Sequence, residues 1–178
     1  MARRAAKAIK AETMSDCCST SKPTAPATAQ PPSCPHCGEK GRPVQLITLR
    51  SLLDLGARLC VGEGPYQFCS SPTCDIVYFG GRRNLPLTKA DLTVRVGIKE
   101  TTAPRPVCYC FNHTIEEIDD ELRRTGRTTV LDDIKTRMKV ACWCETKSPS
   151  GSCCLATVTK QIKAATARLG APEPMEQT

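Results

Sequence analysis

Residues 69–79 decide the fold and read Cys69-Ser-Ser-Pro-Thr-Cys74-Asp-Ile-Val-Tyr-Phe79. A short apolar segment, Tyr66-Gln-Phe68, leads into the first thiol, and a longer apolar run follows the second. Gly80-Gly81 ends that run, as expected of a glycine pair at a turn. The residues around this stretch, 34–98, are predicted to form a small α+β unit.

A second pair of cysteines stands upstream, in Cys34-Pro-His-Cys37-Gly38, a pattern that resembles a zinc knuckle. Thiolates one to four residues apart can point at a common centre, which zinc and iron–sulfur sites require. Gly38 lets the backbone turn tightly so that amide N–H groups reach the thiolates. Four thiolates around zinc close a tetrahedron with no open position, which predicts a structural role.

The predicted zinc ligands are Cys34, Cys37, Cys69 and Cys74. His36 is expected to face solvent, with replacement of one cysteine as the alternative, and Cys60 to be a small buried apolar residue.

The downstream half carries three further close pairs, in Cys108-Tyr-Cys110, Cys142-Trp-Cys144 and Cys153-Cys154. A second set of four thiolates predicts a second metal centre here. Zinc does not change its redox state, whereas an iron–sulfur cluster does, so the metal at this centre decides the function. Trp143 is expected to shield the centre from water.

Composition supports metal coordination as a source of stability. The chain has thirteen cysteines in 178 residues but only three Phe, three Tyr and one Trp. With so few aromatic residues, metal binding is expected to replace part of a hydrophobic core. A disulfide framework is the competing interpretation. The odd number of cysteines, their tight spacing and the lack of a signal-peptide-like apolar run favour reduced thiols and a cytoplasmic location.

The formal net charge of +7 is not evenly distributed. Four basic residues crowd the N-terminus, in a segment rich in Ala, Thr, Ser and Pro, and residues 1–33 are predicted to be a disordered tail. Cys17 and Cys18 in this tail are incidental thiols or a site for a thiophilic metal. A solvated tail is favoured over one that binds nucleic acid or an anionic surface.

Local patterns predict the remaining elements. Residues 44–48 alternate as a short strand, 49–55 can form a helix, and 92–98 alternate as a half-buried strand. Residues 99–107, with two prolines, are expected to be a linker. Thr114 and Glu117 make a capping box for a helix that ends at Gly126. A second helix starts near Thr129, a third follows the last cysteines and ends at Gly170, and 171–178 form a tail.

Val107-Cys-Tyr-Cys-Phe111, two helices and a later cysteine pair resemble the [2Fe–2S] domain of the bacterioferritin-associated-ferredoxin type. The stretches 69–79 and 144–155, together with Arg95-Val-Gly-Ile-Lys-Glu100, are similar to the N-terminal half of CopZ-type copper chaperones. This resemblance covers about 34–160 and implies an α+β fold, with a zinc-binding domain at 34–98 and a helical [2Fe–2S] domain at 108–170. It implies zinc on the four upstream cysteines. It implies a cluster on Cys108, Cys110, Cys144 and Cys154, with Cys142 and Cys153 as the alternatives to the last two. Cys108 and Cys110 are expected to share one iron.

The predicted function is that of a non-enzymatic iron–sulfur protein in electron transfer or redox sensing, linked to copper handling. The full-length chaperones add a copper-binding Met-x-Cys-x-x-Cys domain, which this sequence does not show, so copper delivery is not expected to carry over intact. Neither a phosphate-binding loop nor a hydrolytic site is recognisable. The expected partner is an electron-transfer or copper-handling protein, not a membrane and not nucleic acid. The alternative is a zinc-containing nucleic-acid-binding regulator, which the acidic residues 116–121 oppose.

Overall fold

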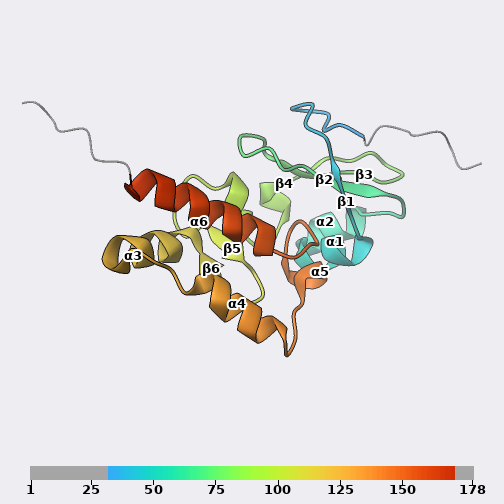
Figure 1. Cartoon of the computed structure of the whole chain (residues 1–178). Helices are drawn as coiled ribbons and strands as arrows, with labels where there is room; N and C mark the ends of the chain where they lie inside the picture. The colour runs from blue at the N-terminus through green and yellow to red at the C-terminus, as the bar shows by residue number, and fades with distance from the viewer. Residues whose placement is uncertain (1–31, 171–178) are drawn as a thin grey trace, which may run out of the picture. The chain divides into compact units, whose positions relative to one another are not determined.

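A four-stranded antiparallel sheet in the order β1-β2-β3-β4 carries the N-terminal layer (Figure 1). The computed structural model describes residues 32–170, so almost all of the predicted N-terminal tail, and the whole of 171–178, lie outside the described residues. The strands are β1 (Arg42–Val44), β2 (Tyr66–Phe68), β3 (Ile76–Gly80) and β4 (Leu87–Thr88). The combination of this sheet with six α-helices in the described residues confirms the α+β prediction.

Two short helices, α1 (Leu46–Leu52) and α2 (Leu55–Cys60), follow β1 and pack on the sheet. The predicted single helix over 49–55 is wrong, because Leu53 and Asp54 are extended and break the chain into two helices. The Asp54 carboxylate accepts a 2.7 Å hydrogen bond from the backbone N–H of Ala57, which caps the second helix. The predicted strand over 44–48 is correct only at its first residue, since α1 already begins at Leu46.

The predicted strand over 92–98 does not form. Instead, the 3₁₀ turn η1 (Lys89–Asp91) precedes these residues and a second turn, η2 (Gly97–Lys99), begins at their end. Leu92 makes only an isolated bridge with Leu53. A Cβ atom on Gly97 would clash with the carbonyl oxygen of Pro106, so the backbone is packed closely against the segment that begins β5. Alternation of apolar residues was therefore a misleading signal here.

The C-terminal layer begins with a hairpin of β5 (Pro106–Cys108) and β6 (His113–Thr114), so the predicted linker 99–107 runs into a strand. Four helices follow: α3 (Ile115–Thr125), α4 (Val130–Met138), α5 (Cys144–Lys147) and α6 (Leu155–Gly170). The Thr114 side chain accepts from the backbone N–H of Glu117, and Gly126 ends α3 in the left-handed region, which confirms both predicted ends of α3. Thr129 is the residue before α4, as predicted.

Helices α3 and α4 pack on α6 and enclose the core of this layer. Ile118, Ile134 and Val158, one from each helix, are fully buried. The half-buried ion pair of Arg168 with Asp119, at 2.6 Å, joins α6 to α3. Among the helices of residues 32–170, none combines the length and apolar character that crossing a bilayer requires.

Candidate metal centres

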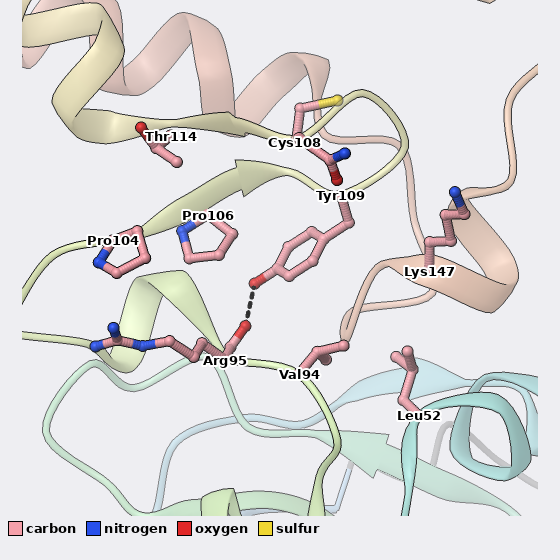
Figure 2. Close-up of a pocket in the computed structure, with 10 residues that line it drawn as sticks. Leu52, Val94, Arg95, Pro104, Pro106, Cys108, Tyr109, Thr114 and Lys147 are labelled. Atoms are coloured by element: carbon pink, nitrogen blue, oxygen red, sulfur yellow. Dashed lines mark hydrogen bonds between the residues drawn. The ribbon is translucent and has the colours of Figure 1, made fainter.

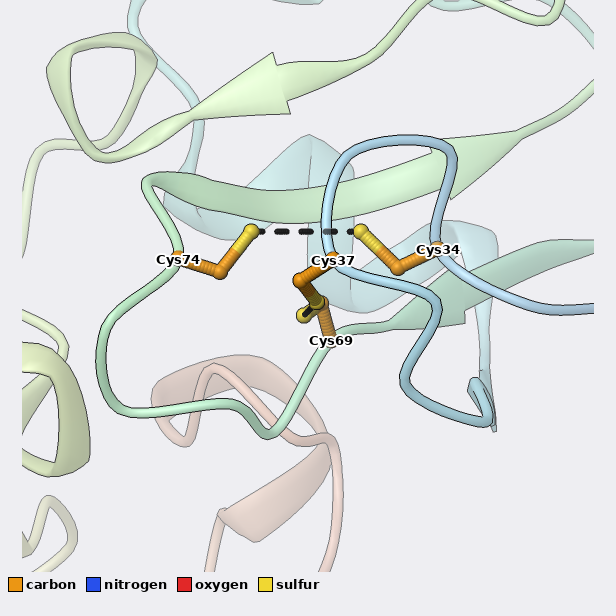
Figure 3. Close-up of side chains that lie close together, drawn as sticks. All are labelled: Cys34, Cys37, Cys69 and Cys74. Carbon is orange, nitrogen blue, oxygen red and sulfur yellow. Dashed lines mark hydrogen bonds between the residues drawn. The ribbon is translucent and has the colours of Figure 1, made fainter.

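The first centre forms where the loop between β2 and β3 meets the turn before β1 (Figure 3). Antiparallel pairing of the two strands brings Cys69, which directly follows β2, close to Cys74, two residues before β3. The backbone N–H of Cys69 donates to the Val77 carbonyl at 2.9 Å, so the ladder continues up to the first thiol. In the upstream turn, the N–H of Gly38 donates to the Cys34 carbonyl, and Gly38 has a φ of 73° that a residue with a side chain rarely adopts.

All four predicted zinc ligands converge in the structure. The sulfur atoms of Cys34, Cys37, Cys69 and Cys74 lie within 4.8 Å of one another. The Cys34–Cys74 separation is 3.9 Å and the Cys37–Cys69 separation is 3.6 Å. Thiolates that share one tetrahedral zinc at about 2.3 Å lie about 3.8 Å apart. The donor type, number and spacing therefore fit zinc, and four sulfurs leave no open coordination position.

Burial controls protonation at the first centre. Desolvation raises the pKa of Cys69 to about 12 and also raises the pKa of Cys74, because a buried thiolate is disfavoured without a counter-charge. At Cys37, which is exposed, a hydrogen bond from the backbone of Glu39 lowers the pKa to about 7. A divalent cation must displace protons from the buried thiols, so metal affinity at this centre falls as the pH falls.

Two further side chains contact this centre. His36 is exposed, as expected, and its Nδ1 atom lies 3.5 Å from the sulfur of Cys74. Lys99 is only 3% exposed, and its Nζ donates to the carbonyl oxygens of Ser71 at 2.7 Å and Cys74 at 2.9 Å. Sequence reasoning missed Lys99, because it assigned this residue to the predicted linker 99–107 rather than to the zinc site. The signal available was its position within Arg95-Val-Gly-Ile-Lys-Glu100.

The second centre takes two cysteines from the β5–β6 hairpin and two from the segment between α4 and α6. Cys108 ends β5 and Cys110 follows in the turn, whereas Cys144 begins α5 and Cys154 directly precedes α6. The sulfurs of Cys110 and Cys144 are 3.7 Å apart. The Cys154 thiol lies near enough to Cys108 to lower the pKa of the Cys108 thiol. The predicted pattern places Cys108 and Cys110 on one iron. In the structure, the close sulfur contact instead joins Cys110 to Cys144, a cysteine of the other segment.

The alternative ligands lie on the outside of this arrangement. Cys142 and Cys153 are exposed, whereas Cys154 is buried and Cys144 is half-buried. Both alternatives line a surface hollow of about 470 Å³ together with Cys144. The contacts with the hairpin cysteines are thus made by Cys144 and Cys154, the two residues preferred from the sequence.

Neighbouring thiols set the protonation of the second centre. The hydrogen bond with Cys154 lowers the pKa of Cys108 to about 6, and the same contact raises the pKa of Cys154. Burial raises the pKa of Cys144 to about 12. The backbone N–H of Trp143 donates to the sulfur of Cys110 at 3.3 Å. The contact between Cys108 and Cys154 therefore favours the thiolate form of Cys108 and the thiol form of Cys154.

Three expectations about the other cysteines and Trp143 need correction or a limit. Trp143 is 53% exposed, with Lys147 Nζ 5.4 Å from its ring centroid, so it does not shield the centre from water. Cys60 is exposed rather than buried, because Ala57 is the residue of α2 that faces the core. All eleven cysteines of residues 32–170 are free thiols, and Cys17 and Cys18 lie outside the described residues.

Known proteins resemble this chain over both centres. A CopZ-type family model, described as a zinc-binding domain, matches residues 31–93. The copper chaperone CopZ of Archaeoglobus fulgidus is 31% identical over 121 residues, which are 68% of this chain and 57% of the chaperone. The X-ray structure of the N-terminal domain of that CopZ matches with a TM-score of 0.62 and 30% identity, covering 79% of this chain and 98% of that domain. This chain thus spans little more than half the length of the chaperone that it matches.

Proposed function

Because the chain belongs to the family of the CopZ N-terminal domain, we propose that it is a non-enzymatic protein carrying zinc at the first centre and a [2Fe–2S] cluster at the second. We propose that it acts in electron transfer or redox sensing linked to copper handling. The relative is named as a copper chaperone, and the family match covers the four-cysteine zinc site of this chain.

The zinc at the first centre is proposed to be structural. Its four cysteines come from the turn before β1 and from both ends of the β2–β3 loop, so one ion joins three segments that lack a large core of their own. Cys34, Cys69 and Cys74 form only a small buried cluster with Ile76 and Phe79. The free energy of metal binding then supplies folding free energy directly.

The spacing of the second set of cysteines is the observation that supports the cluster. Within residues 32–170, only the first set has four ligand atoms all within 4.8 Å of one another. In the second set, the sulfurs of Cys110 and Cys144 are 3.7 Å apart, and the effect of Cys154 on the pKa of Cys108 places these two thiols near each other. A single ion draws four thiolates around one point, whereas a [2Fe–2S] cluster is held by four thiolates, two on each iron. Two separated pairs fit the binuclear cluster better than a second zinc.

The second centre has a buried side, formed by Cys108 and Cys154, and a side that faces solvent, where Cys144 lies. A [2Fe–2S] cluster supplies one-electron transfer, and its potential depends on hydrogen bonds to sulfur and on exposure to solvent. Cys108 and Cys154 are buried, and the N–H of Trp143 donates to Cys110. Cys144 borders the surface hollow, so we propose that electrons pass between this side and a redox or copper-handling protein.

Metal analysis with a visible spectrum tests this function. Protein purified without oxygen should contain one zinc, two irons and two acid-labile sulfides per chain, and should be red-brown. Zinc without iron or sulfide, even after reconstitution, would contradict the cluster. A colourless zinc protein that binds DNA or RNA would support the alternative, a nucleic-acid-binding regulator.

A further inference from the structure

We infer that zinc at the first centre orders the second centre, because the zinc-bearing layer holds in place both segments that supply the second set of cysteines. The inference rests on the proposed zinc binding, but it does not depend on which metal group the second centre takes. Two sets of contacts carry it, one through Lys99 and Tyr109 and the other through Tyr78 and Pro149.

The first link starts inside the loop 69–75 between β2 and β3, called the zinc loop because it carries Cys69 and Cys74. The buried ammonium group of Lys99 donates to the carbonyl oxygens of Ser71 and Cys74, both within the loop that carries two zinc ligands. A buried ammonium group is costly unless it is hydrogen-bonded and faces negative charge. Four thiolates on one divalent ion carry a net charge of about −2, so the zinc-loaded centre provides that negative charge. Lys99 therefore takes up its position most favourably when the first centre holds zinc.

The same segment continues to the second centre. Lys99 ends η2, and the N–H of Gly97, at its start, donates to the Tyr109 hydroxyl at 2.9 Å. That hydroxyl in turn donates to the Arg95 carbonyl at 3.0 Å, and the ring of Tyr109 points towards this segment while the sulfur of Cys108 points away from it (Figure 2). Tyr109 lies between the two hairpin cysteines. Fixing its side chain therefore fixes the backbone from which both thiols project.

The second link reaches the other two cysteines. Tyr78 of β3, four residues beyond Cys74, donates to the Pro149 carbonyl at 2.8 Å, and both residues are buried. Near it, Gly151 lies so close to Thr48 of α1 that a Cβ on the glycine would be 2.9 Å from the threonine Oγ1. Pro149 and Gly151 belong to the segment between Cys144, the first residue of α5, and Cys154, the residue before α6. Helix α1 also packs directly on α5.

Both links are needed because the second centre takes its cysteines from two separate segments, the β5–β6 hairpin and the segment between α4 and α6. The 3.7 Å sulfur contact joins Cys110 of the hairpin to Cys144 of the segment between α4 and α6, so these two segments must be placed together. The sheet with its zinc loop contacts both segments. Loss of zinc removes the negative charge opposite Lys99 and loosens the start of β3, and each effect separates the pairs. By linkage, an occupied second centre also strengthens zinc binding by the same factor.

The test measures thiol reactivity in the full-length chain, reduced, and prepared either without metal or with Zn²⁺ alone. N-ethylmaleimide labelling followed by mass spectrometry reports each cysteine separately. With zinc, Cys108 and Cys154 should react at least tenfold more slowly than without it. Cys142 and Cys153 are exposed and should react fast in both states, which provides an internal control.

Substitutions at Lys99 and Tyr109 test whether these residues carry the zinc-dependent protection. In Lys99→Met and Tyr109→Phe, the zinc-dependent protection of Cys108 should fall severalfold, while the exposed-lysine control Lys163→Met should behave as the unaltered chain. Tyr109→Phe removes a single hydroxyl and keeps the proposal testable if Lys99→Met does not fold. Co²⁺ titration reports metal binding at the first centre by its thiolate absorption band. A chain that binds Co²⁺ but shows equal labelling of Cys108 and Cys154 with and without Zn²⁺ overturns the coupling and leaves the zinc site standing.

Discussion

The Tyr78 hydroxyl donates a 2.8 Å hydrogen bond to the carbonyl of Pro149, 71 residues further along the chain. Tyr78 stands in the strand that leaves the zinc loop, and Pro149 stands in the loop between two cysteines of the second centre. Burial raises the pKa of Tyr78 well above its usual value, so this phenol stays protonated and remains a donor at all physiological pH values.

Tyr78→Phe should destabilise the zinc-loaded protein by about 1–2 kcal/mol, because the Pro149 carbonyl is left buried without its donor. Zinc content should stay at one per chain, since the four ligands are untouched. Urea unfolding of the two proteins measures the difference. Tyr66→Phe is the matched control, because its hydroxyl bonds only to the Gly62 carbonyl nearby in sequence. Equal losses in the two variants would contradict a special role for Tyr78.

Gly97→Ala should be far more costly than a usual glycine substitution. The added Cβ would clash with the Pro106 carbonyl oxygen, so the 3₁₀ turn and β5 must move apart. We expect a loss of more than about 2 kcal/mol of stability and faster alkylation of Cys108. Gly62→Ala is the control, because nothing lies within 4 Å of its Cβ position. A Gly97→Ala protein as stable as Gly62→Ala would show that the close approach is absent in solution.

Serine substitutions should divide the four C-terminal cysteines into two classes. Cys144→Ser or Cys154→Ser should abolish or strongly alter the cluster signal, because these residues contact the hairpin cysteines. Cys142→Ser and Cys153→Ser should leave it nearly intact, since both residues are exposed. Electron paramagnetic resonance of the reduced variants distinguishes them. A normal signal in Cys144→Ser with a lost signal in Cys142→Ser would move the ligand assignment to Cys142.

Glu121 predicts an acid-sensitive junction between α3 and α4. Its carboxylate accepts hydrogen bonds from the Thr128 hydroxyl and the Thr129 backbone N–H, both at 2.7 Å, and these bonds lower its pKa. A pKa lowered by folding stabilises the protein above the unfolded-state pKa, and this contribution is lost as the pH falls through the folded-state value. Glu121→Gln should therefore cost less than about 1 kcal/mol at pH 7, because solvent screens this carboxylate, and the cost should shrink as the pH falls.

Urea unfolding followed by helical circular dichroism at several pH values measures this contribution. The comparison of Glu121→Gln with the unaltered chain at each pH removes the effect of thiol protonation that both share. Glu63→Gln is the control, since Glu63 is exposed and distant in sequence from both helices. A Glu121→Gln difference that stays constant between pH 7 and pH 4 would show that the charge of the carboxylate is not involved.

The features that the sequence predicted correctly are those carried by local chemistry. The side-chain cap at Thr114 and the stop at Gly126 each depend on one helix end, and the structure contains both, although the Glu117 side chain contacts His113 rather than completing the predicted capping box. The close cysteine pairs are likewise local, and the predicted zinc ligands meet at one point. The nearness of Cys69 and Cys74 follows from the β2–β3 hairpin, whose strand segments were visible in the sequence.

The features that were missed depend on partners distant in sequence. Alternation over 92–98 cannot reveal whether another strand is available, and Leu92 meets only Leu53. The inward turn of Lys99 depends on carbonyl groups in the zinc loop, which no helix or strand pattern of its own segment encodes. The pairing of Cys110 with Cys144 depends on how α4 to α6 return to the hairpin, and spacing along the chain does not determine it.

The two sets of cysteines are not interleaved, and this order has a consequence for biosynthesis. All four residues of the first centre lie within 34–74, Lys99 follows, and the second set begins only at Cys108. Because a chain emerges from the ribosome with its N-terminal part first, the first centre is complete before any cysteine of the second exists. A nascent chain can therefore capture zinc early, and the later thiols emerge beside a layer that is already folded.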